Sequence, residues 1–325
     1  MTSQQISITA GWIARHTPTG AGAGGRDAAV IDIAQDLLLR DLHTRDALEA
    51  IVFKGGTALR KLYAGNQGRF SVDLDFSLAR ASDDSEAVVL DLIAHIEGTT
   101  IGPFTYGVVE RRGKWSLTIQ SPFSSGEPSL SSKLDISPPV WLNPVHRGWV
   151  PMPVHNTYGQ PPLPELSVIR LEENIAEKIA RLNRVTTARD MYDLAWIAQH
   201  QHDVGSLDLN LIRRLAVLKI WVDSNGLAGG KAHWRQGHKP CEFDPTSWLR
   251  TRDVSEFDLE DIGALAIPTP SAAELAYVVR TRYRFLSDLD DDELKLAAAS
   301  AKDRRLALKL LERLPGGRLA DIGIY

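Results

Sequence analysis

Residues 69–78 of this chain read Arg-Phe-Ser-Val-Asp-Leu-Asp-Phe-Ser-Leu, and apolar and polar side chains alternate through them without a break. Because successive side chains of a β-strand point to opposite faces, this alternation predicts a strand with one apolar and one polar face. Asp73 and Asp75 share the polar face, with their Cα atoms roughly 7 Å apart. Adjacent carboxylates repel each other unless a cation lies between them, and Mg²⁺ ions held by carboxylates commonly serve nucleotidyl transfer. The alternative is an ordinary surface strand with a solvated polar face.

A glycine-rich turn precedes this strand by a few residues. The apolar run 50–53 predicts a buried strand, Lys54-Gly55-Gly56-Thr57 follows it, and helical spacing resumes over residues 58–63. Strand, glycine pair and helix N-terminus form a phosphate-binding arrangement, because glycine lets backbone N–H groups approach an anion closely. Thr57 is a candidate to cap the helix and to contact a phosphate. The P-loop spacing is absent, and a glycine pair alone is more often only a turn.

Two later segments add candidate site residues. Residues 132–137 alternate again and place Asp135 on a polar strand face, where it is a candidate third carboxylate. The alternative is a solvent-facing aspartate, which the spacing alone favours. Residues 104–110 and 114–120 predict a hairpin whose turn, residues 111–114, reads Arg-Arg-Gly-Lys. A basic turn is a candidate contact for phosphates, although most basic turns are simply solvated.

The second half of the chain is predominantly helical. Leu171, Ile175, Lys178 and Leu182 lie at i, i+4, i+7 and i+11 of a helix predicted over residues 168–183, so Lys178 falls in its apolar stripe. A lysine in such a stripe either extends to the edge of the apolar surface or faces a partner, such as a nucleotide phosphate.

A helix start is predicted directly after this helix. Thr187-x-x-Asp190 has the spacing of a capping box. Asp190 is therefore either a structural residue of the helix start or part of a charge network with Lys178. Further helices are predicted over residues 27–42, 81–97, 209–224, 271–286 and 291–314.

Length and composition limit the class of protein. The 325 residues predict two domains, and the formal net charge of −4 gives no overall basic field, so any binding of nucleic acid requires a local basic patch. A single cysteine excludes an intrachain disulfide, and neither a signal peptide nor a membrane span is evident, which predicts a soluble cytoplasmic protein. His233, His238 and Cys241 have a loose zinc-like spacing without an evident fourth ligand.

Together, these motifs resemble the AbiEii/AbiGii toxin family of nucleotidyltransferases, which includes the MenT toxins. The resemblance is specific over residues 54–76 and 172–194, and general through the helical C-terminal third. It rests on Gly55-Gly56-Thr57-Ala58-Leu59, on residues 69–76, on residues 173–178, and on Arg184, Arg189-Asp190 and Tyr192-Asp193.

The resemblance implies both a fold and an activity. The implied fold is α/β (α+β), with a polymerase β-like nucleotidyltransferase domain on a mixed sheet (residues 1–164) and a mainly helical domain (residues 165–325) that closes the active-site cleft. The implied activity is the Mg²⁺-dependent transfer of NMP from a nucleoside triphosphate onto RNA, typically a tRNA 3′ end, with Mn²⁺ as an alternative metal. Such a toxin blocks translation and growth, and its partner is a cognate antitoxin, typically a winged-helix transcriptional regulator.

The resemblance also implies roles for individual residues. Asp73, Asp75, Lys178 and Asp190 are the candidate catalytic residues, and Asp190 either orients Lys178 or takes part in acceptor activation. The candidate nucleotide-binding residues are Lys54, Gly55, Gly56, Thr57, Arg69, Ser71 and Lys178. The candidate metal ligands are Asp73, Asp75 and, with weaker support from the motif, Asp135.

Two other functions are compatible with the same residues. One is a nucleotidyltransferase that acts on a small molecule or a protein, and the other is an inactive nucleotide-binding module. The intact Asp73/Asp75 pair argues against the inactive module. The sequence identifies neither the base, nor the acceptor, nor the biological role.

Overall fold

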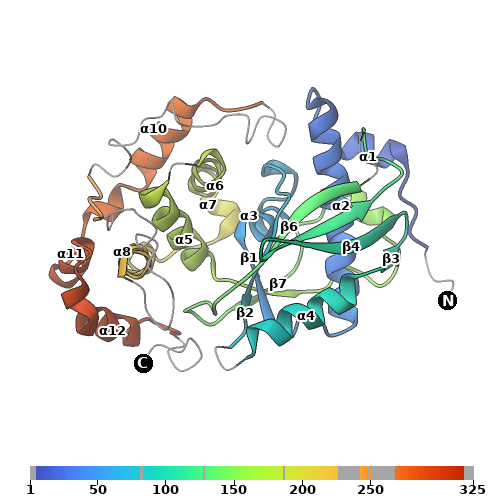
Figure 1. Ribbon diagram of the computed structural model, residues 1–325. Coiled ribbons are helices and arrows are strands. Elements are labelled where there is room, and N and C mark those ends of the chain that lie inside the picture. The colour runs from blue at the N-terminus through green and yellow to red at the C-terminus, as the bar shows by residue number, and fades with distance from the viewer. Residues whose placement is uncertain are drawn as a thin grey trace. The chain divides into compact units, whose positions relative to one another are not determined.

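The computed structural model describes residues 5–80, 83–126, 129–185, 187–225, 242–246, 249 and 268–317. The chain divides into two compact units (Figure 1). Among the described residues, the first unit comprises those within 5–139, 145–168 and 268–269, and the second comprises those within 140–144, 169–249 and 270–317.

The first unit is built on a mixed β-sheet. In the described part of the chain this sheet has eight strands, in the order β3-β4-β5-β6-β2-β1-β8-β7. Strand β2 pairs antiparallel with β1 and parallel with β6, and β1 pairs parallel with β8. The predicted α/β class with a mixed sheet is confirmed. The strands are β1 (Ile51–Lys54), β2 (Leu74–Leu78), β3 (Thr100–Ile101), β4 (Phe104–Arg111), β5 (Lys114–Gln120), β6 (Ser129–Ser137), β7 (Val145–Arg147) and β8 (Leu166–Val168).

Helices cover one face of this sheet. Helix α2 (Gly22–Thr44) packs against β6, and α4 (Ser85–Ile96) packs against β4 beside α2 (Figure 1). The hydroxyl of Tyr106 donates to the carbonyl of Ala34 at 2.7 Å, which fixes β4 to α2. The short helix α1 (Ala10–His16) packs on α2. On β6, side chains that point away from α2 are exposed, so the sheet has a covered face and a polar face.

The alternating stretch of residues 69–78 is only partly a strand. Strand β2 begins at Leu74, so the predicted strand over residues 69–73 is wrong. Side chains take the places that a neighbouring strand would occupy, because Gln35 Nε2 donates to the carbonyl of Val72 at 2.9 Å and the Thr57 hydroxyl donates to the carbonyl of Asp73. Phe70 is buried against α2.

The second unit is helical in its described part. Helices α5 and α8 pack against each other, as do α6 and α10. The single helix predicted over residues 291–314 is wrong, because the chain turns at Ala299, whose φ is +53°. The helices are α5 (Leu171–Arg184), α6 (Ala188–Gln199), α7 (Gln201–Val204), α8 (Leu209–Asn225), α10 (Ala272–Arg282), α11 (Asp291–Ala297) and α12 (Arg304–Glu312).

Two expectations concern membranes and zinc. Throughout the described ranges, no helix has both the length and the apolar character needed to span a membrane. The candidate zinc ligands His233, His238 and Cys241 lie outside the described residues.

Candidate active site

The glycine turn lies directly against one of the predicted metal ligands. Helix α3 (Gly55–Leu59) begins immediately after β1, and Gly55 has a φ of +79°. A Cβ atom at Gly55 would lie 2.4 Å from Oδ2 of Asp75, and Lys54 is paired with Asp75 across β1 and β2. Position 55 therefore requires glycine twice, for its left-handed backbone and for the approach of the carboxylate.

Thr57 ties the turn to the aspartate segment. Its side chain is fully buried, and its hydroxyl donates to the carbonyl of Asp73. The N-cap position of α3 is Lys54, without a side-chain capping bond, so the predicted capping role of Thr57 is wrong. The contact instead fixes the spacing between the turn and the segment that carries Asp73 and Asp75.

Two of the predicted carboxylates are neighbours in the sheet. Asp75 and Asp135 are direct partners in the parallel pairing of β2 and β6, so their side chains share a face on strands about 4.8 Å apart. Asp75 is partly buried and Asp135 is 51% exposed, with its Oδ2 3.4 Å from Nζ of Lys133. Asp73 precedes β2 by one residue.

The carboxylates suit a hard cation chemically, because Mg²⁺ prefers oxygen ligands. Among the described residues, no group of three or more His, Cys, Asp or Glu side chains is close enough to hold a metal. The structure thus brings Asp75 and Asp135 together as a pair. It does not gather Asp73, Asp75 and Asp135 into a closed three-ligand set.

Arg69 and Ser71 lie in the segment that leads into β2, and each is 6% exposed. Nη1 of Arg69 donates to the carbonyl of Phe70 at 3.0 Å. Both side chains are therefore packed within the first unit, on the polypeptide that positions Asp73.

A buried charge cluster, which the sequence reasoning missed, lies just beyond the turn. Residues 60–64 form a π-helical turn. Such turns are rare in proteins overall, and many of them occur at functional sites. Nζ of Lys61 bonds Oδ1 of Asp32 at 2.9 Å and also bonds Asp36, and Nη2 of Arg60 lies 3.2 Å from Oδ2 of Asp32. Asp32, Asp36 and Lys61 are fully buried. The signal in the sequence was two aspartates four residues apart within an apolar helix.

The charges of this cluster are balanced by one another. Burial by itself would raise the pKa of Asp32, but Arg60 and Lys61 outweigh burial and hold that pKa well below its usual range. Burial would likewise raise the pKa of Asp36, but Lys61 outweighs burial and lowers this pKa. The hydroxyl of Tyr158 donates to Asp36 at 2.6 Å.

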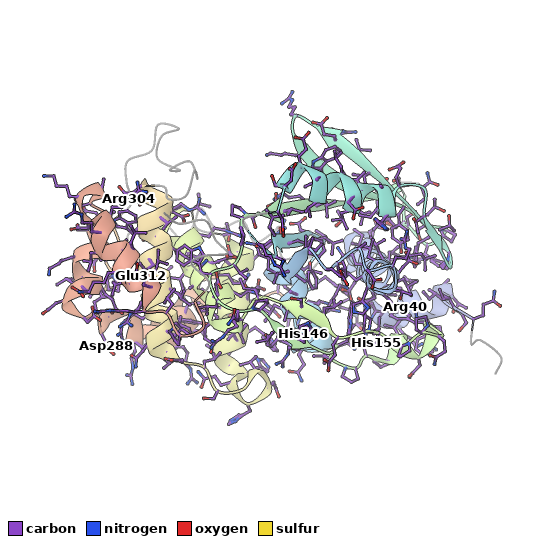
Figure 2. The ribbon with its side chains drawn as sticks, turned by 90° about the horizontal axis from the view of Figure 1, so that it is seen from below. Arg40, His146, His155, Asp288, Arg304 and Glu312 are labelled. Atoms are coloured by element: carbon purple, nitrogen blue, oxygen red, sulfur yellow. The ribbon has the colours of Figure 1, made fainter. Side chains whose placement is uncertain are left out.

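Further side chains border the cluster, and Nε2 of His16 lies 2.8 Å from Oδ2 of Asp32. His155 lies 3.5 Å from Asp36, and Arg40 donates to the carbonyls of Tyr158 and Pro161 at 2.9 and 2.8 Å (Figure 2). The cluster therefore connects α2, the π-helical turn and residues 153–161.

The second group of predicted residues lies in the helical unit. Lys178 on α5 is only 4% exposed, so it does not extend to solvent. Its Nζ donates to Oδ2 of Asp193 at 2.7 Å and to Oδ1 of Asp190 at 3.2 Å, both on α6. Asp193 was not among the predicted site residues, although its i, i+3 spacing from Asp190 places the two on one helix face.

Asp190 has both of the roles that its sequence context left open. Thr187 is the N-cap of α6 and accepts a bond from the backbone N–H of Asp190 at 3.4 Å, which confirms the predicted helix start. The carboxylate of Asp190 accepts hydrogen bonds from Lys178 and from the Thr187 hydroxyl, and it lies 3.4 Å from Arg181. Burial would raise the pKa of Asp190, but Lys178 and Arg181 outweigh burial and lower it.

Comparisons with known proteins identify this arrangement. The family model described as nucleotidyl transferase AbiEii toxin, type IV toxin–antitoxin system, matches residues 36–290. The solved structure of MenT4, a nucleotidyltransferase toxin from Mycobacterium tuberculosis H37Rv, matches with a TM-score of 0.80 and 35% identity, over 95% of this chain and 99% of that one.

The structure of JHP933 from Helicobacter pylori is a more distant match, with a TM-score of 0.45 and 18% identity over 88% of this chain and 97% of that one. The search of curated proteins found no match.

The sheet, the glycine turn and the close match in fold define an NTP-dependent nucleotidyltransferase. This chain belongs to the AbiEii family of nucleotidyltransferase toxins, which act in type IV toxin–antitoxin systems.

Proposed function

We propose that this toxin transfers NMP from a nucleoside triphosphate onto RNA in the cytoplasm, with a tRNA 3′ end as the acceptor, and thereby blocks translation and growth. The observation that carries the proposal is the contact between Gly55 and the carboxylate of Asp75. This contact supports the proposal because nucleotidyl transfer requires a phosphate-binding turn beside a carboxylate that holds a metal ion.

In this proposal each residue of the first unit has a defined task. Backbone N–H groups of Gly55 and Gly56 bind the β and γ phosphates, while Thr57 keeps the turn in register with the aspartates. Asp73 and Asp75, joined by Asp135, hold Mg²⁺ or Mn²⁺. When bound, the metal supplies charge stabilisation at the α-phosphate and at the departing pyrophosphate. Nucleotide contacts from Lys54, Arg69 and Ser71 complete the proposed set.

The reaction forms one bond and breaks one. An acceptor hydroxyl oxygen attacks the α-phosphorus, the bond to the β-phosphate oxygen breaks, and pyrophosphate leaves. The hydroxyl proton passes to a base.

Lys178 and Asp190 are assigned to the same nucleotide in this proposal. An ammonium group has three N–H donors, and two of those on Lys178 bond Asp190 and Asp193. We assign the third to a phosphate oxygen. The 3.2 Å bond from Lys178 to Asp190 supports an orienting role for Asp190. The proposed protein partner is a cognate antitoxin of the winged-helix regulator type.

An incubation with labelled nucleotides tests the proposal. Purified protein is mixed with total tRNA, Mg²⁺ and each of the four α-labelled triphosphates in turn, with the Asp73→Ala variant as the control. We expect label in tRNA from the wild type, none from the variant, and none after periodate oxidation of the tRNA 3′ end. Label that enters a small molecule or a protein but stays out of RNA contradicts the proposed acceptor. RNA labelling by Asp73→Ala contradicts the metal assignment.

A further inference from the structure

The basic turn at residues 111–114 is a feature that the proposed chemistry leaves unused. Strands β4 and β5 form a hairpin whose two-residue loop, Arg112-Gly113, has φ values of +55° and +74°. Two consecutive left-handed residues are typical of a tight hairpin turn. Arg111, Arg112 and Lys114 are all exposed at this tip, and we call them the hairpin cations.

The sheet register places two hairpin cations on the face of the proposed metal ligands. Arg111 pairs with Lys114 across β4 and β5, so their side chains share a face. One residue further along β5, Trp115 pairs with Leu134, which neighbours Asp135 on β6. Because faces alternate along each strand, Lys114 and Asp135 both lie opposite to the Trp115–Leu134 pair.

A single row across the sheet therefore connects the aspartates to the hairpin. Asp75 pairs directly with Asp135, and the next positions outward are Lys114 and then Arg111. At a spacing of about 4.8 Å per strand, these positions lie roughly 5, 10 and 14 Å from Asp75. Cations spaced along one row at this interval complement a chain of phosphates.

Among the described residues, no ion pair involves a hairpin cation. The nearby acidic residue Glu110 pairs with Trp115, which places its side chain on the other face, and its Oε1 accepts a bond from the backbone N–H of Gly113 at 2.6 Å. Lys133 is the basic residue that contacts Asp135. The chain has a net charge of −4, so a polyanion requires a local basic surface of this kind.

We propose that the hairpin cations form a docking surface for the phosphate backbone of the RNA acceptor, and that they guide its reactive end toward Asp75 and Asp135. This inference rests on the proposed transfer to RNA. It selects RNA over an acidic protein because the surface shares a sheet row with the carboxylates that an acceptor must reach.

The test removes the three charges without changing the turn. The variant is Arg111→Gln/Arg112→Asn/Lys114→Gln, in which asparagine tolerates the left-handed backbone at position 112. The matched control, Arg305→Gln/Lys309→Gln/Arg313→Gln, removes three exposed positive charges at α12 in the second unit. Thermal melting confirms that both variants fold.

Binding of end-labelled tRNA is measured by fluorescence anisotropy over a range of salt concentrations. Each lost phosphate contact reduces the magnitude of the negative slope of log K against log salt by about 0.7–0.9. The slope of the hairpin variant should therefore be shallower than that of the wild type by roughly 2. We expect an increase of about tenfold or more in KM for tRNA, with kcat and the Kd for Mg²⁺-nucleotide unchanged. The control variant is expected to match the wild type.

The outcomes separate this inference from the proposed function. If the hairpin variant binds and labels tRNA as the wild type does, the docking surface is refuted while transfer to RNA stands. If the wild type labels no RNA, the proposed function fails first. If the hairpin variant binds RNA as the wild type does but no longer binds the antitoxin, the surface belongs to a protein partner instead.

Discussion

Two pairs of aspartates in the first unit, Asp32/Asp36 and Asp75/Asp135, have different surroundings. Asp32 and Asp36 lie one turn apart on α2, are fully buried, and share the ammonium group of Lys61. Asp75 and Asp135 are side by side across β2 and β6, and Asp135 is half exposed beside an equally exposed lysine. An exposed ion pair of that kind contributes little, roughly 0–1 kcal/mol. Lys61 and Arg60 neutralise the buried pair, whereas the sheet pair lies on the polar face of the sheet, where Asp135 is half exposed.

The buried pair also has a use for the site. Arg60 and Lys61 follow the glycine turn within one or two helical turns, so their bonds to α2 fix where the turn lies. A buried ion pair adds little net stability compared with well-packed apolar residues, but loss of one partner costs much. The comparison therefore predicts opposite consequences for substitutions in the two pairs.

The largest effect is expected from Asp75→Asn, on activity. The substitution keeps the shape of the side chain and removes its charge, so transfer of labelled nucleotide should fall by about 10³-fold, equivalent to roughly 4 kcal/mol of transition-state stabilisation. The melting temperature should change less than in variants of the buried pair, because asparagine keeps the shape of this partly buried side chain. Full activity, or a protein that no longer folds, would remove the distinction between the two pairs.

Lys61→Met is expected to show the reverse pattern. It leaves a buried carboxylate without its partner and should lower the free energy of unfolding by about 3–5 kcal/mol, measured by urea denaturation. The double variant Asp36→Asn/Lys61→Met has a balanced cluster and keeps an oxygen acceptor for the Tyr158 hydroxyl. It should recover at least half of that loss. If Lys61→Met is as stable as the wild type, the buried carboxylates do not depend on Lys61 for their neutralisation.

This contrast also explains what the sequence could predict. The glycine turn could be predicted because its residues are consecutive in the chain, and the Asp73/Asp75 motif could be recognised from its spacing, although Asp73 lies outside β2. The pairing of Asp75 with Asp135 depends on strand order, which places β6 beside β2 across 60 residues of chain. Lys61 lies 29 residues from Asp32 and 25 from Asp36, and no local pattern joins them.

Two differences have local causes. Residues 69–73 do not form the predicted strand, because side chains of Gln35 and Thr57 donate hydrogen bonds to backbone carbonyls of this segment that a neighbouring strand would otherwise bond. Asp193 was missed as a partner of Lys178, yet its spacing from Asp190 would have placed both carboxylates on the same helix face.

A smaller effect should come from Gly55→Ala. Alanine at a φ of +79° is strained by about 1–3 kcal/mol, and its Cβ would push against Asp75. Gly98→Ala is the matched control, since Gly98 has a φ of +72° with nothing within 4 Å of a Cβ. Both variants should lose stability in urea denaturation, and Gly55→Ala should lose more because its Cβ also meets Asp75. Only Gly55→Ala should also raise the KM for nucleotide, and equal KM values in the two variants would show that the contact with Asp75 is irrelevant to the site.

The smallest effect in the neutral range is the pH dependence of stability. Asp32 and Asp36 have lowered pKa values in the folded protein, so their stabilisation is complete above the unfolded value of about 3.9 and is lost as pH falls through the lower folded values. The free energy of unfolding should therefore receive no pH dependence from this pair between pH 5 and 8. Below about pH 4 it should decline, because the unfolded chain binds protons that the folded cluster resists. In Asp36→Asn/Lys61→Met, one titrating carboxylate and its cation are absent, so the acid decline should be shallower than in the wild type. Equal acid declines in the two proteins would show that protonation elsewhere, and not at the buried pair, governs acid unfolding.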